Sequence, residues 1–110
     1  MASQQSIADY IVEQLAGSGV TARKMFGEFG LFAEGKMVAL ICDDQLYVKP
    51  TEAGRAFLGP CPEGQPYPRA KPHFLIPGER WDDAEWLMRL IKLTTAELPV
   101  PAKKSRRSRS

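Results

Sequence analysis

The side chains that could act as a nucleophile or a base are few and lie far apart in the chain. There are two cysteines, Cys42 and Cys61, and one histidine, His73. A nucleophilic thiol needs a base within hydrogen-bonding reach, and a zinc site needs several Cys or His ligands at short spacing. The chain shows neither pattern. We therefore interpret Cys42 as a small buried hydrophobe, Cys61 as an exposed loop residue and His73 as a surface residue, and we predict no catalytic residue.

Two glycines three residues apart, Gly27 and Gly30 in KMFGEFGLF, raise the question of a phosphate-binding loop. Such a loop leads into the N-terminus of a helix, whose N–H groups and dipole hold the anion. The residues after Gly30 are Leu31 and Phe32, which are typical of a strand. We therefore predict that Gly27, Gly30 and Gly35 are structural turn residues that permit a bulge or a sharp bend, and that no cofactor is bound.

Two pairs of adjacent carboxylates, Asp43-Asp44 and Asp82-Asp83, are candidate metal ligands. Each pair also has a local explanation. Asp43-Asp44 suits a turn, and Asp82-Asp83 suits the positive end of a helix dipole. We therefore predict no metal site at either pair.

Basic residues are concentrated at the C-terminal end. Residues 99–110, PVPAKKSRRSRS, hold five of the fifteen basic residues and no acidic residue, so residues 1–98 carry ten basic and thirteen acidic residues, a net charge of −3. A cationic segment binds phosphate backbones through its charge, but it also keeps a chain in solution, and both alternatives stay open. The candidate nucleic-acid-binding residues are Lys103, Lys104, Arg106, Arg107 and Arg109.

The composition is that of one globular domain. A chain of 110 residues, 44% apolar and 25% charged, is long enough for one hydrophobic core. No apolar run approaches the roughly 18 residues of a membrane span, and residues 1–8 lack a secretory signature. We predict a domain over residues 1–98, a basic tail over 99–110 whose composition favours disorder, and a cytoplasmic protein without a membrane partner.

Three helices are predicted. The first begins at Ser3 or Ser6, because apolar residues then recur at helical spacing. Thr51 is a suitable N-cap for a short second helix over EAGRAFLG. The last helix is expected to start at Asp82, whose carboxylate suits an N-cap, and to stop at Pro99.

Residues 21–49 are predicted to form three antiparallel strands. The stretches MFGEFGLFAEG, KMVALICDD and QLYVKP are rich in aromatic and branched residues. Glu34-Gly35 and Asp43-Asp44 lie between them and suit tight hairpin turns.

The central strand is apolar on both sides. Alternation places Met37, Ala39 and Ile41 on one face, but Val38 and Leu40 between them are also apolar. We expect both faces of this strand to be covered, at least in part.

The second half of the chain adds two more strands. A proline-rich loop over residues 60–72 leads to a short strand, HFLIP, with PYPR as an irregular neighbour. The element order is then α-β(3)-α-β(2)-α. This order predicts an α+β fold of two layers, with helices packed on an antiparallel sheet.

One family shares this pattern of residues. RKMFGEFGLFAEGKMVALICDDQLYVK, followed by PYPR and by HFLIPGERWDDAEWLMRLIKLTTAEL, spans about Val20 to Leu98. In these stretches the chain resembles the N-terminal domain of the TfoX/Sxy family, first known from regulators of bacterial natural competence. The resemblance implies a secretion-chaperone-like α-β(3)-α-β(2)-α fold, and it supplies no catalytic residues.

The chain departs from the family in two places. Glu28 stands where the family commonly has a second glycine after MFG. Competence regulators of the family also have a second domain, where this chain has a short basic tail. The resemblance therefore implies a stand-alone N-terminal-domain-like protein, and activation of competence genes is not carried over.

These observations lead to ranked expectations of function. The first is a small non-enzymatic cytoplasmic protein that acts as a binding or regulatory accessory module. The alternative is a nucleic-acid accessory protein that uses the basic tail, and an enzyme is the least favoured reading. The protein partner is unknown. A homodimer is one hypothesis, because strand edges and apolar surface are hard to cover in a domain of this size.

Overall fold

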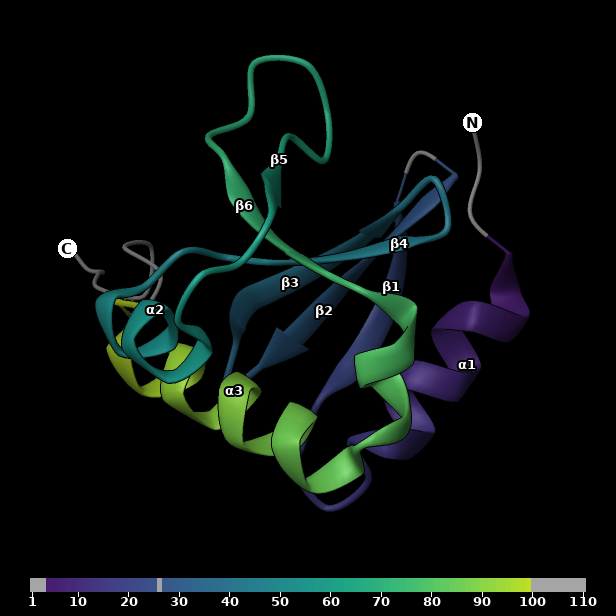
Figure 1. The fold of residues 1–110 in the computed structure, drawn as a ribbon. Helices are drawn as coiled ribbons and strands as arrows, with labels where there is room; N and C mark the ends of the chain where they lie inside the picture. The colour runs from purple at the N-terminus through teal and green to yellow at the C-terminus, as the bar shows by residue number, and fades with distance from the viewer. Residues whose placement is uncertain (1–3, 26, 100–110) are drawn as a thin grey trace, which may run out of the picture.

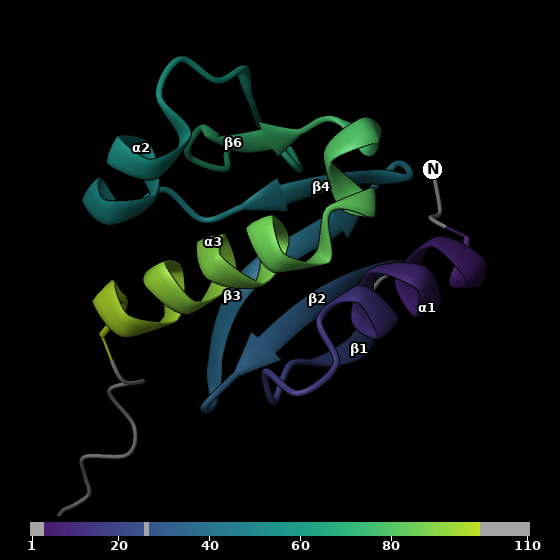
Figure 2. The same cartoon turned by 60° about the horizontal axis from the view of Figure 1, so that its bottom comes forward.

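A computed structural model describes residues 4–25 and 27–99. In this part of the chain, helices pack on one side of a single antiparallel sheet (Figures 1 and 2), which confirms the predicted α+β class. The helices are α1 (Gln5–Gln14), α2 (Glu52–Leu58), the 3₁₀ helix η1 (Gly78–Asp82) and α3 (Ala84–Glu97). The strands are β1 (Thr21–Met25), β2 (Glu28–Ala33), β3 (Lys36–Cys42), β4 (Gln45–Val48), β5 (Glu63–Gly64) and β6 (His73–Ile76).

The strands are ordered β1-β2-β3-β4-β6-β5. Four strands precede α2, where three were predicted, because β1 lies almost entirely ahead of the first predicted stretch, which begins at Met25. β1 is the additional strand. Its sequence, TARKM, is charged and largely exposed, so it lacks the alternation of apolar residues that reveals a half-buried strand. The predicted strand at PYPR is replaced by β5, two residues long, which pairs with β6 at Phe74 and His73.

The hairpin turns contain residues with positive φ. Gly27 has φ 81° between β1 and β2, and Gly35 has φ 77° between β2 and β3. Asp43 and Asp44, with φ 54° and 61°, join β3 to β4. Gly30, expected at a turn, lies inside β2 instead. Gly30 does not have a positive φ. A glycine is needed there because neighbouring side chains occupy the space of a Cβ atom.

A β-bulge changes which residues share a face of β3. Leu31 pairs with Ala39 and Phe32 pairs with Met37, so Val38 is an additional residue in the ladder. Val38 and Ala39 both belong to the core between the sheet and the helices, while Met37 packs on the other side of the sheet. The expectation that Met37 shares a face with Ala39 and Ile41 is therefore wrong at Met37, because alternation is broken at the bulge.

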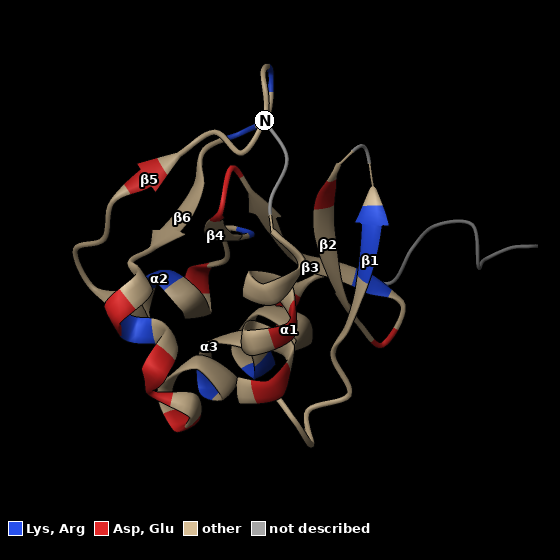
Figure 3. Ribbon diagram, turned by 90° about the vertical axis from the view of Figure 1, so that its right-hand side faces the viewer, with Lys and Arg blue, Asp and Glu red and all other residues tan. Residues whose placement is uncertain are grey.

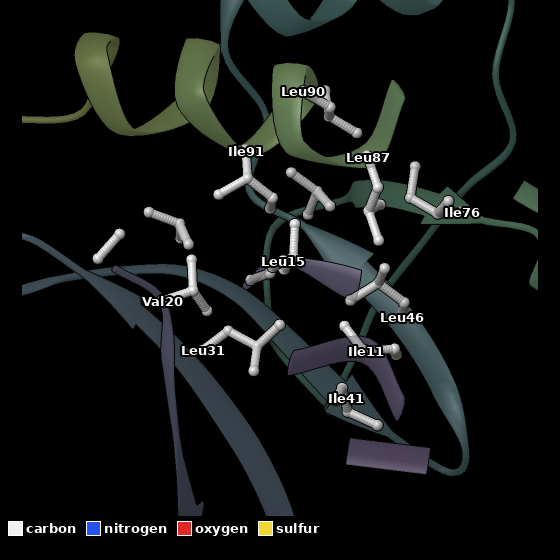
Figure 4. Close-up of a cluster of buried hydrophobic side chains, with 14 of the residues drawn as sticks. Ile11, Leu15, Val20, Leu31, Ile41, Leu46, Ile76, Leu87, Leu90 and Ile91 are labelled. Atoms are coloured by element: carbon white, nitrogen blue, oxygen red, sulfur yellow. The ribbon is translucent and has the colours of Figure 1, made fainter. Parts of the chain in front are cut away.

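The main core lies between the sheet and the helices (Figure 4). It is built from aliphatic side chains of α1, α3 and the central strands, each almost completely buried. Its largest labelled members are Ile11, Leu15, Leu31, Ile41, Leu46, Ile76, Leu87, Leu90 and Ile91. Among the helices of the described residues, none is long and apolar enough to cross a membrane.

Two of the three predicted helix starts differ from the structure. Thr51 caps α2 as predicted, with Oγ1 accepting a hydrogen bond from the N–H of Gly54 at 2.9 Å. The N-cap of α3 is Asp83, whose carboxylate accepts from the N–H of Trp86 at 3.1 Å. Asp82, the predicted cap, ends η1 and accepts from the hydroxyl of Tyr10. α1 follows Gln4, so neither predicted serine is its N-cap.

Candidate binding groove on the open sheet face

The side of the sheet opposite α1 and α3 carries a second apolar cluster. Leu40, Cys42 and Tyr47 are buried there, and Met37 and Leu75 pack against them. In Figure 1 the helices lie below the sheet, and the loop that joins β5 to β6 rises on the other side. We call this side the open face, and its apolar residues with the glycine among them are Met25, Gly30, Met37, Leu40, Cys42, Tyr47 and Leu75.

A groove of about 650 Å³ runs over the open face. Its floor is formed by β2 and β3, around Gly30 and Leu40. Met25 and Glu28, beside the β1–β2 turn, form one wall, and residues 66–68 form the other. Clefts of this size accommodate a small ligand or a few side chains of a partner.

Gly30 allows the floor of the groove to close. A Cβ atom at this position would lie 3.0 Å from Cε1 of Phe32, 3.1 Å from Sδ of Met25 and 3.3 Å from Cε of Met37. These distances are shorter than ordinary van der Waals contact. The absence of a side chain at Gly30 thus lets one aromatic and two methionine side chains lie over the strand.

The wall at residues 66–68, Pro-Tyr-Pro, is held by its own hydrogen bonds. The side-chain amide of Gln65 donates to the carbonyl of Ala70 at 2.7 Å, and the N–H of Ala70 donates to the carbonyl of Tyr67 at 3.1 Å. Two prolines restrict the backbone on either side of Tyr67. Tyr67 is nevertheless 52% exposed. A large aromatic side chain therefore stands over the groove on a restrained loop.

The two charged residues that line the groove are both acidic. They are Glu28 and Asp43, and a carboxylate oxygen of Glu28 accepts from the N–H of Asp43 at 3.1 Å. Arg23 lies farther along the same face, with its guanidinium 4.9 Å from the centre of the Phe32 ring. Charges of both signs therefore border an apolar floor.

His73 is buried, contrary to the expectation of a surface residue. Its side chain is 6% exposed, and Nδ1 lies 2.7 Å from the carbonyl oxygen of Lys71, to which the neutral ring donates. Burial lowers the pKa of His73, and the charge of Lys49 lowers it further, although the hydrogen bond to Lys71 acts in the opposite direction. The ring is therefore neutral at physiological pH, and its Nδ1 is already hydrogen-bonded to the backbone.

Neither cysteine resembles an activated thiol. Cys42 is buried in the groove floor, and its pKa is raised to about 11 by burial and by the negative charges of Glu28 and Asp43. Cys61 is half-buried and packs against the main core, so it is less exposed than predicted, and burial raises its pKa as well. Both thiols stay protonated at neutral pH.

The other predicted site residues are not brought together. Asp43-Asp44 and Asp82-Asp83 lie in separate turns, and within residues 4–25 and 27–99 no three His, Cys, Asp or Glu side chains gather as metal ligands. The tail residues Lys103, Lys104, Arg106, Arg107 and Arg109 lie outside the described residues.

A second, more polar groove lies between α2 and α3. It has a volume of about 720 Å³ and is lined by Phe57 and Trp86 together with several charged side chains. The rings of Phe57 and Trp86 are 5.7 Å apart, and the guanidinium of Arg80 lies 4.6 Å from the Trp86 ring. Trp81 is also half-buried and donates to the carbonyl of Ile76 at 3.1 Å. Both tryptophan side chains thus pack on the helical side of the sheet, against the main core.

The sequence profile of the TfoX N-terminal domain matches residues 13–98. This chain belongs to the TfoX N-terminal domain family. A relative in Spirochaeta aurantia, described as an uncharacterized 12.7 kDa protein in the trpE 5′ region, is 37% identical over 103 residues. That alignment covers 92% of this chain and 88% of the relative. The residues that line the groove all lie within the matched part of the TfoX N-terminal domain.

Sequence reasoning did not find the groove of this TfoX N-terminal domain. One signal was available, because the apolar residues on both faces of β3 indicated that a second face was covered. Two further features decide the shape of the groove. The bulge brings Met37 to the open face, and the loop folds back so that Tyr67 overhangs residues more than 20 positions earlier in the chain.

Proposed function

We propose that this TfoX N-terminal domain protein is a non-enzymatic cytoplasmic accessory protein, with a binding or regulatory role, whose open face contacts another polypeptide. The observation that carries the proposal is the apolar groove with Tyr67 standing exposed above it. An exposed aromatic residue beside apolar surface is a typical centre of a protein interface. Cys42 and Cys61 are free thiols, which agrees with a cytoplasmic location.

A polypeptide suits the groove better than a small polar substrate. Substrate sites combine an apolar lining with several convergent polar groups that orient the ligand. Here Glu28 and Asp43 are polar, and Glu28 is bonded to the backbone of Asp43. Methionine side chains, such as Met25 and Met37, adapt to the shape of an apolar partner.

The chemistry of the reactive side chains also favours binding over catalysis. Burial holds Cys42 as a protonated thiol and His73 as a neutral ring that donates to a backbone carbonyl. A general base needs access to its substrate and a nucleophile needs the thiolate form. We therefore assign both residues to packing.

Photo-cross-linking in living cells tests the proposal. A photoreactive phenylalanine analogue replaces Tyr67, and a matched variant carries it at Tyr10, which is 37% exposed on the helical side. We expect a cross-linked polypeptide from position 67 and little from position 10, because the open face is the contact surface. Equal cross-linking at the two positions, or none at position 67, would contradict the proposal.

A second candidate function is binding to nucleic acid through the tail. The specific observation is the separation of charge, because the fifteen basic residues include five in residues 99–110, where there is no acidic residue. In Figure 3 the helices of the folded part carry acidic and basic segments mixed together, and β1 carries a basic segment. We expect DNA or RNA binding that weakens steeply with salt and is lost on deletion of residues 99–110. Equal binding by the full and shortened chains would contradict this function.

A further inference from the structure

The outer edge of β1 is a surface of the sheet apart from the groove beneath Tyr67. β1 comes first in the order β1-β2-β3-β4-β6-β5 and pairs with β2, so among the described residues no strand lies on its outer side. In Figure 3 β1 is the outermost strand on one side, and the helices lie toward the other strands. Residues 21–24 of β1 are all exposed. This edge is therefore accessible to another chain.

Two residues of β1 direct their backbone groups outward. Met25 pairs with Glu28 and only two residues join them, so this pair exchanges both of its backbone hydrogen bonds. Alternation along the ladder gives Arg23 the same bonding to β2. The N–H and C=O groups of Ala22 and Lys24 therefore point away from β2. A strand laid along this edge meets a donor and an acceptor at each of these two residues.

A groove between α1 and β1 lies beside this edge. It has a volume of about 540 Å³, with α1 as one wall and the start of β1 as the other. The lining residues are Gln5, Asp9, Val12, Glu13, Val20, Thr21 and Ala22. A strand added to a sheet edge is held by main-chain hydrogen bonds, and pockets for its alternate side chains select its sequence. The edge of β1 offers both features.

The charged side chains of β1 are basic. Arg23 projects on the open face, where its guanidinium lies 4.9 Å from the centre of the Phe32 ring. Lys24 projects on the helical side, because it pairs with Phe29 of the main core. β1 contains no acidic residue, and within residues 4–25 and 27–99 neither basic side chain forms an ion pair. The positive charge of the edge is therefore not neutralised.

A second copy of β1 does not suit this edge. Antiparallel pairing that uses both outward residues sets Ala22 of one copy against Lys24 of the other. Arg23 of each copy then lies directly opposite Arg23 of the other copy. Like charges directly opposite each other destabilise a sheet, and charged edge strands prevent association of copies in this way. A partner strand of opposite charge has no such cost.

We propose that the edge of β1 binds an extended polypeptide strand in which acidic residues alternate with apolar ones. Its acidic side chains lie on the side of the open face, opposite Arg23. Its apolar side chains enter the groove between α1 and β1, because Asp9 and Glu13 would repel an acidic side chain there. This inference goes beyond the proposed function, since the added strand extends the sheet at β1 and does not contact Tyr67.

Fluorescence anisotropy with a labelled synthetic peptide, SEVEVES, tests the inference on the full chain. Glutamate and valine alternate in this peptide. The control peptide SEEEVVS has the same composition and charge without the alternation, so a basic tail attracts both peptides equally. We expect SEVEVES to bind about tenfold more tightly than SEEEVVS, because its charged and apolar side chains lie on opposite sides of the strand.

Side-chain variants locate the contact. Arg23→Glu should weaken the binding of SEVEVES about tenfold, because it places a carboxylate opposite the acidic residues of the peptide. Arg89→Glu, the same change at an exposed position of α3, should change the affinity little. Tyr67→Ser should also change it little. Circular dichroism confirms that each variant is folded.

Backbone pairing is tested at Ala22. Proline has no N–H, and at this outward position its introduction leaves the hydrogen bonds between β1 and β2 in place. Ala22→Pro should weaken the binding of SEVEVES about tenfold, whereas Ala22→Ser, which keeps the N–H, should not. In the wild type, saturation with SEVEVES should slow amide exchange at Ala22 and Lys24 more than at Arg23, whose N–H is already bonded to β2.

Four outcomes would overturn the inference. They are equal affinity for the two peptides, binding that Arg23→Glu does not weaken, equal binding by folded Ala22→Pro and Ala22→Ser, and unchanged amide exchange at Ala22 and Lys24. The exchange measurement uses the wild type, so it decides the question even if Ala22→Pro does not fold. Each of these outcomes leaves the cross-linking test at position 67, and with it the proposed function, unaffected.

Discussion

At Gly30, three side chains occupy the space that a Cβ atom would need. Phe32, Met25 and Met37 approach that position to between 3.0 and 3.3 Å. Gly30→Val should therefore force the aromatic and methionine side chains outward and lower the free energy of unfolding by about 1–3 kcal/mol, the usual cost of overpacking. Denaturation in urea measures the change.

A second glycine provides the control for this prediction. Gly78, in η1, has no atom within 4 Å of a Cβ placed on it. Gly78→Val should therefore cost less than Gly30→Val. If the two variants lose the same stability, the crowding around Gly30 is not what requires a glycine there.

His73 should make stability depend on pH near neutrality. Burial lowers its pKa below the unperturbed value of about 6.5, so as pH falls the unfolded chain takes up the proton first. The stability contributed by the neutral ring is full above pH 6.5 and is lost as pH decreases below it. Urea denaturation of wild type and His73→Gln at about pH 7.5 and about pH 5.5 measures this. The wild type should lose more stability than the variant, and equal losses would contradict the prediction.

Single residues were predictable where their neighbours in sequence decide their surroundings. Cys42 was predicted to be buried because it ends an apolar strand, and it is 5% exposed. His73 was predicted at the surface and is buried, because β6 lies between β4 and β5, which come from other parts of the chain. The order of polar and apolar residues along the chain does not show which strands will pair beside His73.

Helix α2 depends on a carboxylate from another helix. With seven residues it is too short to be stable alone. The carboxylate of Glu97, at the end of α3, accepts hydrogen bonds from the N–H groups of Glu52 and Ala53, both at 2.9 Å. These bonds, from Ala53 and Glu52, lower the pKa of Glu97. A negative charge at the start of a helix also interacts favourably with the helix dipole.

Glu97→Gln should lower the thermal midpoint at neutral pH. Because the pKa of Glu97 is lowered in the folded state, its contribution is full above the unperturbed pKa of about 4.3 and is lost as pH falls through the folded-state value. The difference between wild type and variant should therefore narrow toward about pH 3. Glu13→Gln, at an exposed carboxylate on α1, is the matched control. A difference that is constant with pH would contradict the assignment.

Elements were predicted well where the signal is local. The cap at Thr51 and the turns at Gly35 and Asp43 follow from a few adjacent residues, and the structure contains them. β1 was not predicted, because an exposed charged strand has no apolar alternation and its position depends on pairing with β2. The start of α3 was placed one residue early, because Asp82 and Asp83 are equally good caps in sequence.

At the scale of the whole molecule, the fold class was predictable and the groove was not. The α+β class follows from the order of helices and strands, which the chain itself displays. The groove requires residues 66–68 to lie opposite Met25 and Glu28, about 40 positions earlier, and it requires the bulge at Val38. Long-range packing of this kind leaves no periodic signature.

Hydrogen exchange over the whole chain separates the two layers of the fold. If another polypeptide binds the open face, its release should increase exchange at the amide of Tyr67 and along β1 and β2. Exchange in α1 and α3 should stay unchanged, because these helices lie on the other side of the sheet (Figure 2). Mass spectrometry of peptides after exchange measures both layers in one experiment. Changes confined to α2 and α3 would instead assign the contact to the groove beside Trp86 and contradict an interface on the open face.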